Sequence, residues 1–210
     1  MAERDRRSTE DGEGDGAYEV EVKVPADHDR VRDRLAELDA TSTGGVVQVD
    51  TYFDAPHRSF AETDEALRVR RERAIDAVAA ADDPVDEDHP ADEIVELTYK
   101  GPLVDAGSKT RSEVETVVAD GDSVETILES LGFEAAATVR KERERFDVDD
   151  VTVSLDTVDG VGRYVEVERR AEEAAIEETR ADLYAVLDSL GLDPADQVRT
   201  SYLGLKLDGA

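Results

Sequence analysis

The chain has 210 residues, which is enough for one domain with a substantial core or at most two small ones. Its 54 aspartates and glutamates outnumber 25 lysines and arginines, and the formal net charge of -29 opposes the approach of nucleic acid or an anionic membrane surface. The absence of cysteine excludes disulfides and Cys-ligated zinc, and no apolar run approaches the ~20 residues that span a bilayer. We therefore expect a cytoplasmic protein that contacts neither nucleic acid nor membrane.

Arginine outnumbers lysine by 20 to 5, and alanine and valine often replace larger apolar residues. Together with the acid excess, this bias indicates adaptation to a cytoplasm of molar salt, where the Debye length falls to ~3 Å and repulsion between surface carboxylates is screened. The alternative is an ordinary acidic chain that is partly disordered. The regular strand periodicity described next disfavours that alternative.

A charged segment, a strand and a helix are predicted in the first part of the chain. Residues 1–16 are rich in charge and glycine and lack an apolar stretch, so we expect a disordered tail and no secretory signal. Residues 18–24 alternate strictly between valines and charged residues, the pattern of a strand with one buried face. Asp27 can cap a helix whose apolar residues recur at i, i+4 and i+7.

The middle of the chain continues with alternating segments. The pair Gly44-Gly45 is expected to break the chain before the next strand. Strands are predicted at residues 46–54, 66–72, 93–101 and 110–119. Between the second and third of these, residues 74–92 are rich in alanine, aspartate and proline and are interpreted as a flexible acidic insertion in a hairpin.

The last third combines two helices with three more strands. Ser123 is expected to cap a helix that ends at Gly132. The strands are predicted at residues 134–147, 151–157 and 163–169, and a helix from about 173 to 190 follows. The tail from Ser201 fits either a short helix or a strand.

Each of the eight predicted strands has one apolar face and one face with charges of both signs. In this very acidic chain, the polar faces collect the cations Lys23, Arg68, Arg70, Lys100, Arg111, Lys141, Arg143 and Arg145. An open sheet with a solvated face is the simpler interpretation. We favour a closed barrel whose charged interior holds a highly anionic ligand and whose apolar exterior is covered by helices.

Seven segments, in order, resemble the motifs of the CYTH superfamily, which groups class IV adenylyl cyclases with thiamine triphosphatases and inorganic triphosphatases. The first, Glu19-x-Glu21-x-Lys23, resembles the ExExK signature. The others are QVDTYFD, ALRVR, LTYKG, TRSEVE, VRKERERF and SLDTVDGVGRYVEVE. The layout resembles class IV adenylyl cyclases more than short inorganic triphosphatases. The resemblance implies an α+β fold, an eight-stranded antiparallel barrel with helices outside, in a single domain over residues 17–207.

The resemblance also implies roles for the polar residues. A triphosphate carries about four negative charges that need cationic partners when buried, and arginine offers a bidentate fork where lysine offers a point charge. The implied phosphate-binding set is Arg68, Arg70, Lys100, Arg111, Lys141 and Arg143, with Arg145 on the same face near the end of its strand. Lys23, Arg143 and Asp156 are the implied catalytic residues.

Carboxylates two residues apart on one strand face lie ~6.5–7 Å from each other along the strand, so pairs on facing strands could hold one or two metal ions. The implied ligands for Mg²⁺ or Mn²⁺ are Glu19, Glu21, Asp156, Glu166 and Glu168. Salt bridges to the neighbouring cations are the alternative role for these carboxylates. Glu113 and Glu115 are expected to position cations.

The sequence leaves three functions open. The first is cyclisation of ATP to cyclic AMP and pyrophosphate, as in class IV adenylyl cyclases. The second is hydrolysis of tripolyphosphate, thiamine triphosphate or a nucleoside triphosphate, because both reactions need the same cations and carboxylates. The third is binding of polyphosphate or triphosphates without turnover. The apolar strand faces also permit a homodimer.

Overall fold

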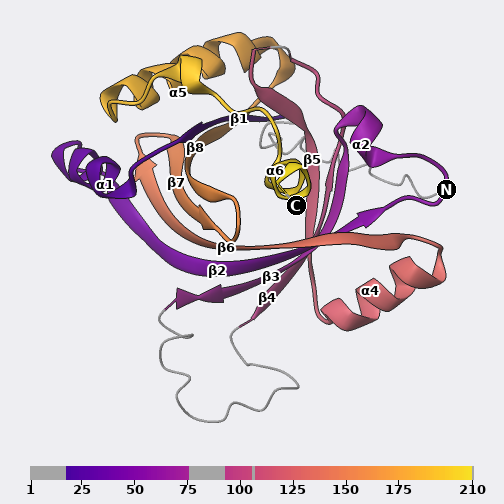
Figure 1. Ribbon diagram of the computed structural model, residues 1–210. Helices are drawn as coiled ribbons and strands as arrows, with labels where there is room; N and C mark the ends of the chain where they lie inside the picture. The colour runs from indigo at the N-terminus through magenta and orange to yellow at the C-terminus, as the bar shows by residue number, and fades with distance from the viewer. Residues whose placement is uncertain (1–17, 76–92, 106, 210) are drawn as a thin grey trace, which may run out of the picture.

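A computed structural model describes residues 18–75, 93–105 and 107–209, and its eight strands close into an antiparallel barrel (Figure 1). The strand order around the barrel is β1-β5-β4-β3-β2-β6-β7-β8. The strands are β1 (Tyr18–Pro25), β2 (Thr41–Asp54), β3 (Ala66–Ala74), β4 (Ile94–Lys100), β5 (Lys109–Val118), β6 (Glu134–Val148), β7 (Val151–Val158) and β8 (Gly162–Ala171). The predicted fold class is therefore confirmed.

Alternation along the strands separates a charged interior from an apolar exterior. In β1, Val20, Val22 and Val24 are buried in the hydrophobic core, whereas Glu21 and Lys23 face the interior cavity. Successive side chains of a strand point to opposite sides of a sheet, so the strand register determines which side chains lie on each face. The sequence pattern therefore determines which side chains meet inside the barrel.

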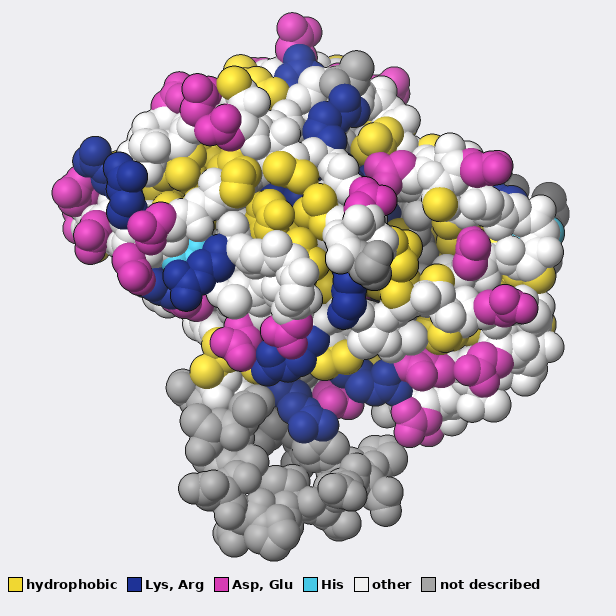
Figure 2. Space-filling model, in the orientation of Figure 1, with side chains coloured by type: hydrophobic (Ala, Val, Ile, Leu, Met, Phe, Trp, Pro, Cys, Tyr) yellow, Lys and Arg dark blue, Asp and Glu magenta, His cyan; other side chains and the backbone are white. Residues whose placement is uncertain are grey.

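Helices pack against the barrel, mostly on its outside (Figure 1). They are α1 (His28–Glu37), α2 (Phe60–Thr63), α4 (Gly121–Ser130), α5 (Ile176–Ser189) and α6 (Tyr202–Asp208), with short 3-10 helices at Glu173–Ala175 and Pro194–Asp196. Among the described residues, no helix is long and apolar enough to cross a membrane. Acidic side chains are spread over α1, α4 and α5 on the visible face (Figure 2).

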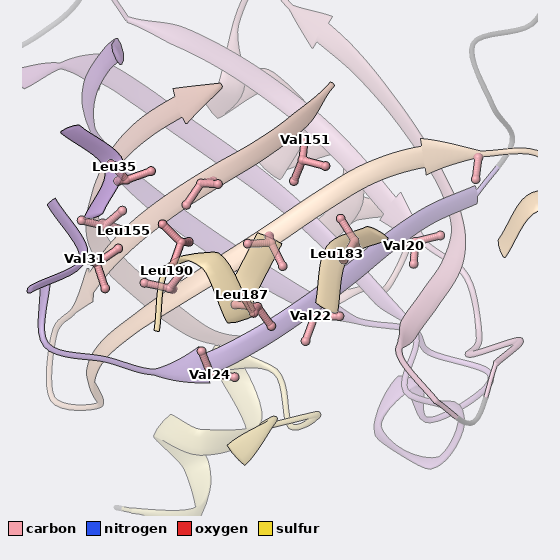
Figure 3. Packing of buried hydrophobic residues seen from close by; sticks show 14 residues of the cluster. Val20, Val22, Val24, Val31, Leu35, Val151, Leu155, Leu183, Leu187 and Leu190 are labelled. Atoms are coloured by element: carbon pink, nitrogen blue, oxygen red, sulfur yellow. The ribbon is translucent and has the colours of Figure 1, made fainter. Parts of the chain in front are cut away.

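The largest core cluster lies between the barrel wall and helices α1 and α5. Leu183 and Leu187 of α5 are completely buried, and they pack with Leu35 of α1 over the valines of β1 (Figure 3). Burying one leucine side chain contributes roughly 1.5–3 kcal/mol. This cluster therefore anchors α1 and α5 to the outer faces of β1, β7 and β8, whose inner faces line part of the cavity.

Two smaller clusters hold the rest of the barrel. Leu128 of α4 packs with Val69 of β3 and Val95 of β4 on the outside. Tyr202 of α6 packs with Val139 and Val158 on the inner side of the sheet, and α6 lies within the ring of strands in Figure 1. The C-terminal helix therefore covers part of the barrel interior.

Several boundaries differ from the expectations. Gly44 does not break the chain, because β2 runs through it with a register shift between Ser42 and Gly44. Gly44 adopts a φ of +108°, which a glycine accommodates at a β-bulge without strain. The cap of α4 is Asp120, whose carboxylate accepts from the amide of Ser123, rather than Ser123 itself.

The C-terminal tail forms a helix, capped by Ser201. The predicted tail at residues 1–16 lies outside the described residues, and so does the predicted insertion except for its first two residues. Of these, Ala74 belongs to β3. The domain boundaries that depend on these segments stay predictions.

Candidate active site

The barrel encloses a cavity of about 730 Å³ whose wall consists mostly of charged residues. Every lysine and arginine of this wall comes from a barrel strand: Lys23, Arg68, Arg70, Lys100, Lys109, Arg111, Lys141, Arg143, Arg145, Arg169 and Arg170. The cavity therefore contains all the predicted phosphate-binding residues. Four of the five predicted metal ligands, Glu19, Glu21, Glu166 and Glu168, also line it, whereas Asp156 is fully buried beneath Arg143 and does not.

Two arginines are fixed by buried aspartates on neighbouring strands. Arg70 faces Asp50 across the β2–β3 ladder and donates from Nε and Nη2 at 2.6 and 2.8 Å. Arg143 faces Asp156 across the β6–β7 ladder and donates at 2.6 and 2.5 Å, with a further bond to Glu166. The arginines hold the pKa of Asp50 and of Glu166 well below their usual range despite burial.

Other cavity cations are held more loosely. Arg68 lies 3.6 Å from Asp50 and 3.8 Å from Glu113, and its Nε is buried without a hydrogen-bond partner among the described residues. Lys141 lies 3.8 Å from Asp156, and burial together with the nearby Arg143 lowers its pKa to about 7. These contacts leave both side chains available to a phosphate oxygen.

Three carboxylates converge on one point of the cavity. Glu19, Glu21 and Glu168 each offer an oxygen atom, and these atoms lie within 4.8 Å of one another. Glu21 and Glu168 are direct cross-strand partners, an arrangement that is destabilising for like charges. Burial and the repulsion of Glu19 and Glu166 raise the pKa of Glu168 to about 8.

This donor set fits a hard divalent cation. Mg²⁺ and Mn²⁺ prefer carboxylate oxygens, and a cation at this point would relieve the repulsion that the three carboxylates experience. The structure thus brings together three of the five predicted metal ligands. Asp156 and Glu166 instead lie in ion pairs with Arg143.

Lys100 and Arg111 lie beside the carboxylate cluster. Lys100 is 2.7 Å from Glu19 and 2.6 Å from Glu113, the residue predicted to position a cation. Arg111 donates to the carboxylate of Asp64 at 2.8 Å, just after α2. Both cations reach this position because β4 ends and β5 begins at the same part of the barrel.

Helix α6 contributes an aromatic ring to the site. The ammonium of Lys23 lies 4.2 Å from the centroid of the Tyr202 ring, and that of Lys141 lies 5.2 Å from it. Lys23 also donates to the carbonyl of Thr200 at 2.8 Å and lies 3.9 Å from Glu166. Lys23, a predicted catalytic residue, is therefore oriented by the ring of Tyr202, the carbonyl of Thr200 and the carboxylate of Glu166.

Sequence reasoning missed several residues of the site, among them Asp50, Lys109 and Tyr202. Asp50 shares the alternating face of β2 with Tyr52, and its position opposite Arg70 could have been inferred from the motif QVDTYFD. Lys109 begins β5 one residue before the predicted strand, on the face of Arg111. Tyr202 gives no sequence signal, because its role depends on where α6 packs.

A closed antiparallel barrel with a cation-lined cavity and a convergent carboxylate cluster defines a site for a highly charged phosphate compound. The CYTH domain profile matches residues 17–202, and the chain belongs to the CYTH family. This family contains adenylate cyclase-like enzymes and triphosphatases, its fold binds triphosphate substrates, and its enzymes generally depend on divalent metals.

Individual relatives agree with this assignment. A Methanocaldococcus jannaschii protein named "Putative adenylate cyclase MJ0240" is 32% identical over 190 residues, 90% of this chain and 98% of the relative. The PH1819 protein of Pyrococcus horikoshii has a TM-score of 0.78 and 35% identity, covering 91% of this chain and 99% of the other.

A Hippeastrum protein, a "putative adenylyl cyclase" that shows a dominant triphosphatase activity, has a TM-score of 0.60. Its identity is 17%, over 91% of this chain and 95% of the other. This likeness supports the fold.

Proposed function

We propose that this protein is a divalent-metal-dependent enzyme that converts ATP to cyclic AMP and pyrophosphate. The observation that carries the proposal is the convergence of the Glu19, Glu21 and Glu168 carboxylates with many lysines and arginines in one cavity. The name of the Methanocaldococcus relative supports cyclisation over other reactions of the family.

Two groups of cations would bind the triphosphate, one held in a fixed orientation and one free to adjust. Arg70 and Arg143 are oriented by buried aspartates, so their remaining donors are preorganised before substrate enters. Arg68, Lys100 and Lys141 would approach phosphate oxygens more freely. Charge-assisted hydrogen bonds of this type are roughly twice as strong as neutral ones.

Cyclisation forms a bond between the ribose 3′ oxygen and the α-phosphorus and breaks the bond from that phosphorus to the leaving pyrophosphate. Negative charge grows on the leaving pyrophosphate, and fixed cations such as Arg143 would stabilise it without reorganisation. A divalent cation held by Glu19, Glu21 and Glu168 would lower the pKa of the attacking hydroxyl and neutralise phosphate charge.

Hydrolysis of a triphosphate is the second candidate. It is favoured by the low exposure of the aromatic residues at the cavity, because Tyr52 and Tyr202 are only 8% and 6% exposed. A nucleobase usually needs an apolar or aromatic wall, whereas tripolyphosphate needs only cations. In this reaction water replaces the ribose hydroxyl as the nucleophile.

The two candidates are separated by their products. The purified protein in molar KCl would be given ATP, tripolyphosphate or thiamine triphosphate with Mg²⁺ or Mn²⁺, and products would be identified by mass. Cyclic AMP and pyrophosphate from ATP would support cyclisation, and diphosphate with phosphate would support hydrolysis. Tight binding without any product would contradict both and indicate a binding module.

The carboxylate cluster supplies the matched variants. Glu21→Gln removes one candidate metal ligand, and we expect turnover to fall by at least about 100-fold, because the metal-binding charge is lost. Glu129→Gln, on an exposed turn of α4, is the control for the change in net charge. Equal turnover in wild type and Glu21→Gln would contradict the proposed metal site.

A further inference from the structure

Lys109 differs from all other cations of the cavity wall. Each of the others has a carboxylate oxygen no farther than 3.9 Å. Lys109 has no ion pair and no hydrogen bond to any residue that the structure describes, although its side chain lines the cavity and the residue is only 8% exposed. Its charge therefore has no counterion within the described protein.

A buried charge without a partner costs free energy, so a buried cation that lacks one calls for an explanation, such as a ligand. The charges around Lys109 do not remove this cost. Lys23 and Arg111 lie nearby and repel it, and Glu21 and Asp64 attract it from beyond ion-pair distance. An anion that enters the cavity would supply the missing counterion.

The strand register indicates which part of a ligand would meet Lys109. Glu21 is the cross-strand partner of Lys109 in β5 and of Glu168 in β8. Side chains of directly opposed residues lie ~4.5–5.5 Å apart at Cβ. Lys109 and Glu168 therefore lie on the two strands that flank Glu21 of the carboxylate cluster.

We propose that Lys109 is a substrate-binding residue whose ammonium contacts the phosphoryl group lying next to the cluster of Glu19, Glu21 and Glu168. This inference rests on the proposed function, since it takes a triphosphate as the ligand. A lysine suits this position because its point charge can follow a phosphate oxygen, whereas the arginines in ion pairs hold fixed directions.

Calorimetric titration with inorganic tripolyphosphate, in molar KCl with and without Mg²⁺, tests the contact. Lys109→Met keeps the length of the side chain and removes its charge, and we expect it to weaken binding by ~10–100-fold. Lys109→Arg keeps the charge, and we expect its binding to stay closer to wild type than that of Lys109→Met. Arg34→Met, on the exposed side of α1, removes one cation far from the cavity and serves as the control.

The melting temperature of the ligand-free variants separates ligand binding from a structural role. An unpaired cation destabilises the free protein, so Lys109→Met is expected to melt at the wild-type temperature or above it. A lower melting temperature, a failure to fold, or unchanged tripolyphosphate affinity would overturn the inference. If wild type itself binds neither tripolyphosphate nor ATP, the proposed function fails first, and the inference fails with it.

Discussion

At the scale of single residues, the site is built from charges that fix one another across neighbouring strands. Asp50 and Arg70 illustrate this, because both are buried and they face each other in the β2–β3 ladder. Removing one partner of such a pair leaves an uncompensated buried charge. The surrounding protein cannot solvate that charge, so the pair is coupled strongly to stability.

The first prediction concerns this pair. Asp50→Ala is expected to lower the free energy of unfolding by about 3–5 kcal/mol, because Arg70 then loses its buried partner. Urea denaturation followed by circular dichroism measures the change. Asp159→Ala breaks an exposed pair with Arg140 and should cost at most about 1 kcal/mol. An equal loss of unfolding free energy in the two variants would show that the buried pair contributes no more to stability than the exposed one.

The second prediction concerns the pH dependence produced by Glu168. Its pKa is raised from about 4.5 to about 8, so the folded protein binds an extra proton between these values. The free energy of unfolding should therefore fall as pH rises through that window, by up to about 1.4 kcal/mol per pH unit. In EDTA, Glu168→Gln should lack this contribution.

Urea titrations of wild type and Glu168→Gln between pH 5 and 9 measure the difference. Mg²⁺ favours the ionised carboxylate, so its addition at pH 9 should stabilise wild type more than the variant. If the free energy of unfolding of the two proteins depended on pH in the same way in EDTA, Glu168 would not have the raised pKa on which this prediction depends.

At the scale of elements, β2 and α6 show how far the sequence can be interpreted. Alternation predicts the inward face of every strand, because a period of two assigns each side chain to one side. It does not reveal that Gly44 continues β2 through a bulge, since a glycine is equally typical of a turn. The strand ends therefore depend on pairing partners that are distant in sequence.

Helix α6 could not be placed from the sequence for a related reason. Its segment fits both a helix and a strand, and tertiary contacts such as that of Tyr202 with Tyr164, with ring centroids 5.5 Å apart, hold it at the cavity. The candidate site was predictable where it lies on strands. Tyr202 was not, because its contribution comes from tertiary packing.

The third prediction separates the ring of Tyr202 from its hydroxyl. Tyr202→Ala leaves a void beside Val139 and Val158 and should cost about 3–5 kcal/mol of unfolding free energy. The hydroxyl is buried without a hydrogen-bond partner among the described residues, so Tyr202→Phe should leave stability unchanged or higher. Thermal denaturation compares the two, and a large loss in Tyr202→Phe would contradict the assigned packing role.

At the scale of the whole molecule, the chain carries a net charge of -29 and yet assembles many of its cations inside the barrel. Lysine is rare in this chain, and four of its five lysines line the cavity. This segregation is visible in the sequence as mixed charge on alternating strand faces. The closure of the barrel, which converts those faces into one cavity, depends on the pairing of β1 with both β5 and β8.

We expect the carboxylate cluster and the cavity cations to bind a divalent metal and a triphosphate together. A crystal structure with Mn²⁺ and tripolyphosphate would show this, because Mn²⁺ is located by its anomalous scattering. A Mn²⁺ peak is expected among Glu19, Glu21 and Glu168, with phosphate oxygens on Arg68 and Lys109. Mn²⁺ bound elsewhere, or tripolyphosphate on the outer surface with the cavity empty, would contradict this expectation.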